Sequence, residues 1–338
     1  MKIKDLTIPK LTAPIEIMIE VETRCNFRCN FCFNKESFAK NGRTSKKVGA
    51  DIIKKIINET SRLNIKIIRF TGGEPLLRED IFELLKHAKR QKLETRLNTN
   101  ASLINEEMTV KFFGLLDNVL IPIESWNKKR EEEITGYKNS LNKKIKAIRL
   151  LDKIKVPKIR VGTVVTKENI KNFDKLASLI LKLPIHEWEF YRPMNAKTKK
   201  EDLQKLDLEK LVKKIIALKK KTKKRVFIAN AIPFCAISQP EKLSSVCVGA
   251  LYEDGHSRLV VDPRGFIKPH YFIDKKLGKA TEIEKAWQNP WLKKIHSLGY
   301  LPLKCQTCQY LETCCGGSRF LAKKISGDWL AADPLFTE

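Results

Sequence analysis

Short β-type runs alternate with helical patterns over the first two-thirds of the chain. Between the runs, apolar residues recur at helical spacing, as in Ile53, Ile56 and Ile57 and in Leu84, Leu85 and Ala88. This alternation is typical of parallel strands joined by crossover helices, and it predicts an α/β partial (β/α)6 TIM-like barrel. Sites in such barrels lie at the carboxyl ends of the strands. The expected strands are Ile15–Val21, Ile65–Phe70, Glu94–Asn98, Asn118–Ile123, Lys158–Val165 and Glu187–Tyr191.

The pattern changes in the last third of the chain. Residues 197–225 predict one basic amphipathic helix, with an apolar stripe that includes Leu203, Leu206 and Leu211. After Val226, residues 258–269 predict two strands about a turn at residues 262–265, and a helix is expected around residues 283–298. We therefore expect a lead-in over residues 1–14, a barrel over 15–225 and a smaller α+β domain over 226–338.

Composition and charge describe a folded protein. The chain has 338 residues, 42% hydrophobic and 31% charged, which excludes collagen-like and mostly disordered chains. No apolar run is long enough for a signal peptide or a membrane span, so a soluble, cytoplasmic protein is expected. The net charge of +27 would suit an anionic partner, and residues 197–225 carry 13 Lys/Arg against 4 Asp/Glu. That helix reads either as a solvated outer helix or as an RNA-binding face.

Three thiols follow the first expected strand, in Cys25-x3-Cys29-x2-Cys32. In a reducing compartment, cysteines at such short spacing indicate metal ligands rather than disulfides. An all-cysteine four-iron cluster takes four thiolates, and a structural zinc site usually has four ligands. Three thiols in one loop would therefore leave one iron open for another ligand.

This loop resembles the motif of the radical S-adenosylmethionine (radical SAM) superfamily, including the aromatic Phe31 before the third cysteine. The resemblance implies that Cys25, Cys29 and Cys32 ligate a [4Fe-4S] cluster. It also implies that the amino and carboxylate groups of SAM chelate the open iron, and that Phe31 packs toward SAM.

Two further segments resemble that family at later strand ends. Thr71-Gly72-Gly73-Glu74-Pro75 follows the second strand, and its glycines would let backbone groups approach the methionine amine, with Glu74 beside it. At the next strand end, Asn98 and Asn100 are expected to reach polar groups of SAM. Where many relatives have a serine contact this chain has residues 122–125, with Glu124 or Ser125 as replacements. Arg160 and Thr163, on the fifth strand, are candidate partners for the SAM carboxylate.

Six cysteines remain near the C-terminus, and the run Cys305-x2-Cys308-x5-Cys314 has metal-ligand spacing. With Cys247 and residues 261–270, this run resembles the SPASM or twitch extension of the family, which binds auxiliary [4Fe-4S] clusters. Relatives have a cysteine where this chain has His270 and another at Ser318. We therefore expect one auxiliary cluster, held by Cys247, Cys305 and Cys308 and completed by Cys314 or His270, since histidine can replace cysteine on iron. Cys235 and Cys315 are left as free thiols or alternate ligands.

The resemblance implies an oxidoreductase or maturase that cleaves SAM reductively to a 5′-deoxyadenosyl radical and abstracts hydrogen from its substrate. A reduced flavodoxin or ferredoxin would supply the electron. The substrate would be a peptide, a protein side chain or a small-molecule cofactor precursor. Two alternatives stay open: a radical SAM enzyme that modifies tRNA or nucleotides, favoured by the charge, and a non-enzymatic zinc-bearing adaptor that binds RNA or protein.

Overall fold

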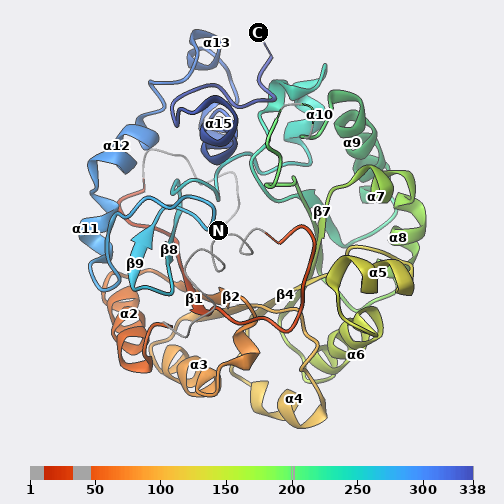
Figure 1. Cartoon of the computed structure of the whole chain (residues 1–338), viewed down its shortest axis with the longest axis vertical. Helices are drawn as coiled ribbons and strands as arrows, with labels where there is room; N and C mark the ends of the chain where they lie inside the picture. Colours follow the sequence, from red (N-terminus) through yellow and green to blue (C-terminus); the bar gives the residue numbers. More distant parts are fainter. Residues whose placement is uncertain (1–10, 33–46, 199, 201, 338) are drawn as a thin grey trace.

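A single curved sheet forms the centre of the computed structural model, which describes residues 11–32, 47–198, 200 and 202–337 (Figure 1). The strand order is β10-β9-β8-β1-β2-β3-β4-β5-β6-β7, and every pair from β8 to β7 is parallel. The strands are β1 (Glu16–Glu22), β2 (Ile67–Gly72), β3 (Glu94–Asn98), β4 (Asn118–Pro122), β5 (Lys158–Val164), β6 (Glu187–Tyr191), β7 (Arg225–Ile228), β8 (Arg258–Val261), β9 (Phe266–Lys268) and β10 (Gly278–Lys279).

Helices surround this sheet on its outer side (Figure 1). Their apolar faces and the outward residues of the strands form one core, whose members include Ile17, Ile19, Ile53 and Ile56. None of the described helices is long and apolar enough to cross a bilayer. The helices are α2 (Ala50–Arg62), α3 (Ile81–Arg90), α4 (Glu106–Phe112), α5 (Lys128–Thr135), α6 (Ser140–Lys153), α7 (Lys167–Lys171), α8 (Phe173–Ile180), α9 (Lys205–Lys219), α10 (Pro240–Ser244), α11 (Ile283–Trp287), α12 (Pro290–Ser297), α13 (Leu303–Gln306), α14 (Leu311–Cys314) and α15 (Arg319–Ser326), with 3-10 turns η2 (Pro75–Leu77) and η3 (Phe234–Ala236).

The six expected strands and the α/β barrel-like class are confirmed, with shifts of one or two residues at strand ends. The long basic helix is wrong at both ends, because α9 covers only Lys205–Lys219 and Arg225 begins β7, where it pairs with Glu187 of β6. The apolar stripe also loses Leu206, which is 68% exposed.

The C-terminal third contributes strands to the same sheet. The expected hairpin is present as β8 and β9, with the Gly265 N–H donating to the Asp262 carbonyl at 3.0 Å, and β8 pairs with β1. The expected helix over residues 283–298 is two helices, because Pro290 starts α12 and Asn289 caps it. The division at residue 225 stays a prediction, and the sheet continues across it.

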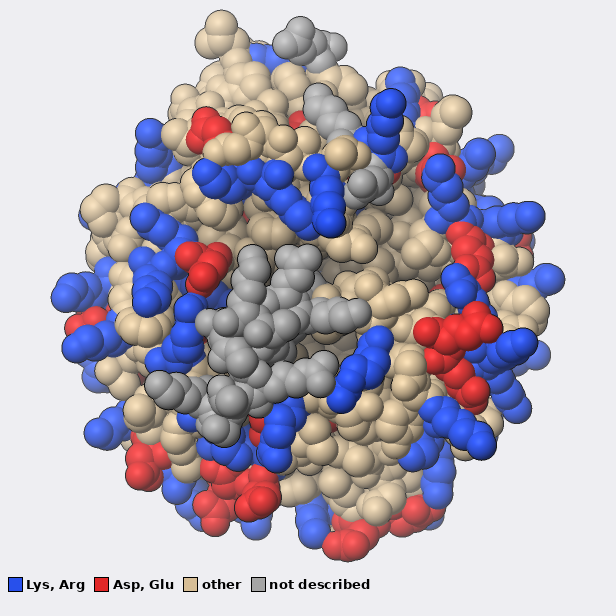
Figure 2. Space-filling view, viewed as in Figure 1, with Lys and Arg blue, Asp and Glu red and all other residues tan. Residues whose placement is uncertain are grey.

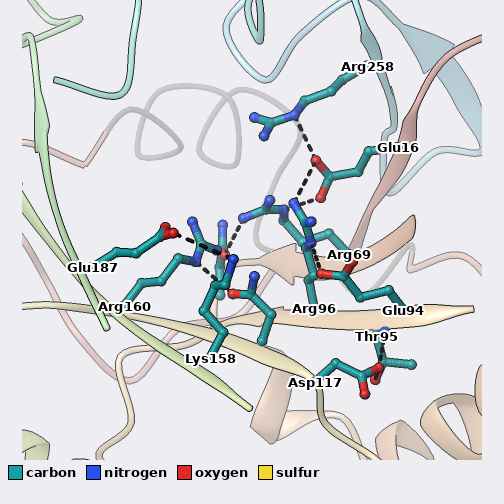
Figure 3. Close-up of polar contacts among 12 residues, drawn as sticks. Glu16, Arg69, Glu94, Thr95, Arg96, Asp117, Lys158, Arg160, Glu187 and Arg258 are labelled. Atoms are coloured by element: carbon teal, nitrogen blue, oxygen red, sulfur yellow. Dashed lines mark hydrogen bonds and ion pairs between the residues drawn. The ribbon is translucent and has the colours of Figure 1, made fainter. Parts of the chain in front are cut away.

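Charged residues fill the amino-terminal half of the barrel interior (Figure 3). Glu16, at the start of β1, is fully buried and meets three guanidinium groups. The distances are 2.7 Å to Arg69 Nε, 3.6 Å to Arg96 Nη1 and 2.7 Å to Arg258 Nε. Burial acts to raise the pKa of Glu16, but Arg258, Arg69 and Arg96 together hold it well below its ordinary value. The carboxylate therefore stays ionised and neutralises part of the arginine cluster.

We predict that Glu16→Gln lowers the free energy of unfolding by about 3–5 kcal/mol, because it leaves the buried Arg69 and the partly buried Arg96 and Arg258 without their shared anion. Urea unfolding at pH 7 measures this. The wild-type advantage should shrink as the pH falls below about 4, since the unfolded carboxyl then binds a proton that the folded one resists. Glu107→Gln, at an exposed Lys111 pair, is the control and should leave the free energy of unfolding nearly unchanged. An equal loss for both variants would contradict the role of Glu16.

Candidate active site

A cavity of about 1060 Å³ runs through the barrel interior. Its lining includes the cysteine loop that follows β1, the ends of β2 and β3, and charged residues near the amino ends of the strands, such as Lys158 and Glu187. The carboxyl and amino halves of the barrel therefore share one space. This volume exceeds what a single small ligand of ordinary size fills, since drug-sized sites span roughly 300–1,000 Å³.

Cys25, Cys29, Cys32 and Phe31 all line this cavity. The loop that carries them is fixed to the end of α5: the Arg28 N–H donates to the Thr135 carbonyl at 2.8 Å, and the Asn30 N–H donates to the Ile134 carbonyl at 3.0 Å. Phe27 stacks on Tyr137 with ring centroids 4.5 Å apart. The strand end and α5 together hold the three thiols against the cavity.

The arrangement of the three thiols suits a cluster better than a single ion. Among the residues that the structure describes, no three His, Cys, Asp or Glu side chains converge where one metal ion could bind. A four-iron cluster does not need such convergence, because each thiolate binds a different iron. Burial raises the pKa of Cys29 to about 12, and the neighbouring Lys144 opposes this shift. A bound cation would therefore have to displace the proton of that thiol.

Gly72 and Gly73 line the cavity and hold the cysteine loop in place. The Gly73 N–H donates to the Glu22 carbonyl at 2.7 Å, and the Glu74 N–H donates to the Arg24 carbonyl at 2.8 Å. A Cβ on Gly73 would lie 2.2 Å from the Arg24 carbonyl oxygen. At Gly72, where φ is +128°, it would lie 2.3 Å from the Glu22 oxygen. Only glycine fits this close approach, which sets the backbone that leads into Cys25.

Glu74 and Pro75 lie outside the cavity lining. The fully buried Glu74 carboxylate accepts hydrogen bonds from the Thr99 hydroxyl at 2.6 Å and from the backbone N–H groups of Asn100 and Leu76 at 2.7 and 3.0 Å. Burial raises the pKa of Glu74 to about 7, and these donors oppose the shift. These hydrogen bonds connect the ends of β2 and β3. A direct contact between the Glu74 carboxyl and SAM stays a prediction, and the position of Glu74 outside the cavity does not favour it.

Asn98 and Asn100 both line the cavity but at different depths. Asn100 Nδ2 lies 3.8 Å from Cys25 Sγ and donates to Asn26 Oδ1 at 2.8 Å, so Asn100 borders the cysteine loop. Asn98 accepts a hydrogen bond from Arg69 Nη1 at 3.0 Å and belongs to the charged half of the barrel. Of the two, Asn100 is placed for the predicted contact beside the cluster.

Arg160 also belongs to the charged half, where it bonds Asn118 Oδ1 at 2.6 Å and Glu189 Oε1 at 2.7 Å. Thr163 faces the opposite side of β5, and its hydroxyl donates to the Ile123 carbonyl and accepts from Trp188. Neither Thr163 nor Trp188 lines the cavity. Thr163 is therefore placed for core packing, and Arg160 lies deep in the barrel, away from the cysteine loop.

Glu124 lies on the cavity, in the segment where many relatives have a serine that contacts SAM. It lines the cavity, its carboxylate accepts from the Val164 N–H at 2.7 Å, and its own N–H donates to Glu131 at 3.0 Å. Burial and the neighbouring Glu131 raise the pKa of Glu124 to about 8, while Lys144 opposes the shift. At neutral pH this carboxyl is largely protonated and can donate a hydrogen bond.

A second group of thiols gathers at the C-terminal side of the molecule. The charge of Cys314 acts on the pKa of Cys247, and the charge of Cys235 acts on the pKa values of Cys305 and Cys314, so these thiols lie in one region of the fold. Cys308 neighbours Cys305, and its N–H donates to the Cys305 carbonyl at 3.1 Å. Cys235 is the member that the sequence pattern did not assign; the Phe234–Tyr310 ring contact at 5.5 Å brings it to the cysteine turn.

Gly249 explains how distant parts of the chain form this group. Its φ is +61°, and a Cβ there would lie 2.2 Å from the Thr313 carbonyl oxygen. The next residue, Ala250, donates its N–H to the Cys314 carbonyl at 3.3 Å. This close approach places Cys247 beside the turn that carries Cys314.

His270, one of the two candidates to complete the auxiliary cluster, lies on the barrel cavity, so its position favours the other candidate, Cys314. It is buried on the barrel cavity, with Nε2 3.3 Å from Glu253 Oε2. Its position follows from β9, which pairs with β8 and so carries His270 to the β1 side of the barrel. Burial lowers the pKa of His270 to about 3, with Arg258 and Lys268 adding to the effect, so the ring is neutral.

The cysteine loop, the glycine turn and strands β2 to β5 lie in a segment that matches a known protein family. The model of the Radical SAM superfamily matches residues 19–180, which form a radical SAM domain and confirm the expected resemblance. Among curated proteins, the chain is 23% identical over 335 residues to a PqqA peptide cyclase of Bradyrhizobium diazoefficiens, covering 95% of this chain and 85% of that protein. It is 22% identical over 349 residues to an AdoMet-dependent heme synthase of Methanosarcina barkeri, covering 97% of each.

Solved structures share the fold over nearly the whole chain. SuiB of Streptococcus suis bound to S-adenosylmethionine has a TM-score of 0.75 at 18% identity, covering 97% of this chain and 77% of that one. The native anSMEcpe structure with bound AdoMet has a TM-score of 0.72 at 19% identity, covering 95% and 93%. Because these matches extend beyond residue 180, the barrel with a C-terminal extension is a shared architecture.

We predict that Gly73→Ala destabilises the protein by about 1–3 kcal/mol and reduces iron bound at the cysteine loop, because its Cβ would overlap the Arg24 carbonyl. Thermal unfolding and iron analysis after anaerobic reconstitution measure the two effects. Gly49→Ala is the matched control, since nothing lies within 4 Å of its Cβ and its φ of −63° suits alanine. Normal iron loading of Gly73→Ala would show that the close approach is dispensable.

Proposed function

We propose that this radical SAM enzyme cleaves SAM reductively and abstracts a hydrogen atom from a peptide or protein substrate. The observation that carries the proposal is the group of three thiols on one cavity, beside the glycine turn, within the matched domain. The names of two relatives support a peptide: one is a PqqA peptide cyclase, and SuiB has been solved with its precursor peptide SuiA. A small cofactor precursor is the second candidate, supported by the name of the heme synthase relative.

The residues present fit a [4Fe-4S] cluster and SAM. Cys25, Cys29 and Cys32 would hold the cluster, and the backbone of Gly72 and Gly73 would border the methionine end of SAM. When bound, these two groups accept one electron from a reduced flavodoxin or ferredoxin and supply a 5′-deoxyadenosyl radical, which takes a hydrogen atom from the substrate. We expect Phe31 to pack against SAM, and Asn100 to orient Cys25 and the adjoining turn.

The barrel's own residues would bind and orient the substrate. The cavity continues past the cysteine loop toward Tyr191 and Tyr271, so a substrate side chain can enter the barrel while the rest stays nearer the mouth. Protonated Glu124 offers a hydrogen-bond donor at the same level as the thiols. Enclosure by the barrel would keep a reactive radical away from water and other side chains.

We propose that the C-terminal thiols hold one auxiliary [4Fe-4S] cluster. Cys305 lies within range of the charges of Cys235 and Cys308, Cys314 lies within range of Cys235 and Cys305, and Cys247, within range of Cys314, is a fifth candidate. This extends the ligand set expected from the sequence by Cys235 and replaces His270. The chemistry of the donor set fits, because thiolates are the usual ligands of such clusters.

Cysteine replacement tests the first cluster. We predict that anaerobically reconstituted wild type forms 5′-deoxyadenosine from SAM and dithionite, and that Cys29→Ala forms none, because the cluster loses one of three protein ligands. Liquid chromatography of the products measures this. Cys315→Ala is the control: this fully buried thiol donates to the Glu312 carbonyl at 3.4 Å and belongs to neither proposed ligand set. A fully iron-loaded wild type that cleaves no SAM would refute the proposed activity.

Cys235→Ser tests the second cluster. We predict a fall from about eight to about four irons per chain, with SAM still perturbing the electron paramagnetic resonance signal of the reduced protein. Cys315→Ala should keep the full iron content. Unchanged iron in Cys235→Ser would remove that residue from the ligand set, and zinc in place of iron in wild type would favour the adaptor alternative.

Figure 2 shows Lys and Arg side chains spread over one face of the molecule, both around its edge and beside its central hollow, with Asp and Glu mainly toward the edge. In α9 the buried residues Leu208, Leu211 and Ile215 form the inner face, as expected for an outer helix. A peptide substrate therefore stays the proposal.

A further inference from the structure

The amino-terminal half of the barrel interior contains arginine side chains that the proposed radical chemistry does not use. Arg69 and Arg160 are 3% and 6% exposed, and both line the cavity. Their Nε and Nη1 atoms have partners, namely Glu16 and Asn98 for Arg69, and Asn118 and Glu189 for Arg160. In both residues Nη2 is buried without a hydrogen-bond partner. A buried guanidinium N–H without an acceptor is costly, so an acceptor is expected from outside the chain.

The two arginines reach the same space from neighbouring walls of the barrel. Figure 3 shows Arg160 on one side and Arg69 with Arg96 on the other, all directed into the interior. Arg160 Nε donates to Asn118 Oδ1 on β4, and Arg69 Nη1 donates to Asn98 Oδ1 on the neighbouring strand β3, so both guanidinium groups face the same part of the cavity. One ligand can therefore meet both Nη2 groups.

Charge in this half of the barrel favours an anion. The described residues around the space contribute six cations and four carboxylates, each carboxylate paired with at least one of the cations. Glu253 and Glu20 border the group, but burial raises the pKa of each. The cations are Arg69, Arg96, Lys158, Arg160, Arg225 and Arg258, and the carboxylates are Glu16, Glu94, Glu187 and Glu189.

We propose that Arg69 and Arg160 bind a carboxylate of the substrate, either an acidic side chain or a chain-terminal carboxylate. Two guanidinium N–H groups suit the two oxygens of a carboxylate. The proposal rests on the peptide-modifying function and specifies which feature of the peptide the barrel recognises. Anchoring this group would fix which C–H bond lies near the cysteine loop.

Depth separates this subsite from the SAM carboxylate. Arg69 lies three residues before Gly72, and Arg160 four before the end of β5, which is roughly 10 Å below the carboxyl ends of the strands. The SAM carboxylate is expected on the open iron beside the cysteine loop. The geometry therefore assigns Arg160 to the substrate rather than to SAM, in place of the contact expected from the sequence.

Glutarate, a small dicarboxylate, tests the subsite directly. We predict that iron-loaded wild type binds one glutarate per chain in calorimetry at low salt, that SAM does not compete, and that N-acetylglycine amide, which has no carboxylate, does not bind. The double variant Arg160→Gln/Glu189→Gln removes the cation without leaving Glu189 unpaired, and should bind glutarate at least about tenfold more weakly. Arg160→Lys keeps the charge and should weaken binding less.

Arg130→Gln is the matched control, because this exposed arginine pairs with Glu168 at the surface, and it should bind glutarate as wild type does. Absence of saturable glutarate binding to wild type, equal binding by the double variant, or competition by SAM would each overturn the subsite. The proposed function fails separately, by absence of 5′-deoxyadenosine from SAM, and glutarate binding does not depend on that outcome.

Discussion

The close approach between the glycine turn after β2 and the end of β1 is the constraint on which the site depends. Gly73 and Glu74 donate to the carbonyls of Glu22 and Arg24, and no side chain fits at either glycine. The backbone that leaves β1 is therefore fixed at Glu22 and Arg24, three residues and one residue before Cys25. The Glu74 carboxylate also accepts hydrogen bonds from Thr99 and Asn100, which follow β3. The side chain of Asn100 in turn contacts the Cys25 thiol. Three strand ends thus position one thiol loop.

The barrel interior has two chemically different halves. Thiols, glycines and the protonated Glu124 surround the carboxyl ends of the strands, whereas the amino ends carry the arginine and glutamate cluster around Glu16. Since barrel interiors are usually packed with branched apolar side chains, a charged and open interior is a departure that function can explain. With the radical formed at the carboxyl ends of the strands and the substrate bound by polar groups at the amino ends, one barrel would both bind a substrate and limit which of its atoms the radical can reach.

Sequence patterns predicted the strands and the thiol loop because those features are local. Alternation of apolar residues located β1 to β6, and the spacing of Cys25, Cys29 and Cys32 located the site. Arg69 was missed and Arg160 was expected at the SAM carboxylate, although Glu94, Arg96 and Asn98 alternate on one strand and Lys158 and Arg160 on another. Polar residues at every second position of a strand that is buried on both faces point to a polar interior, and this signal was present.

Contacts between segments that lie far apart in the chain could not be predicted from the sequence. His270 was one of two candidates to complete the auxiliary cluster, because relatives have a cysteine at its position, but strand pairing to β8 carries it to the barrel. Cys235 has no motif around it, and only the packing of η3 against Tyr310 brings it to Cys305 and Cys314. The early end of α9 likewise depends on the pairing of Arg225 with β6, which helical periodicity does not report.

We propose that the barrel thiols and the C-terminal thiols hold two separate iron–sulfur clusters. The decisive experiment is Mössbauer spectroscopy with iron counting, on wild type and on a variant with Cys25, Cys29 and Cys32 all changed to alanine. We predict that wild type holds about eight irons and that SAM changes the spectrum of one cluster. The variant should keep about four irons, whose spectrum SAM leaves unchanged. Full iron in the variant, or a SAM response that persists in it, would rule out two separate clusters.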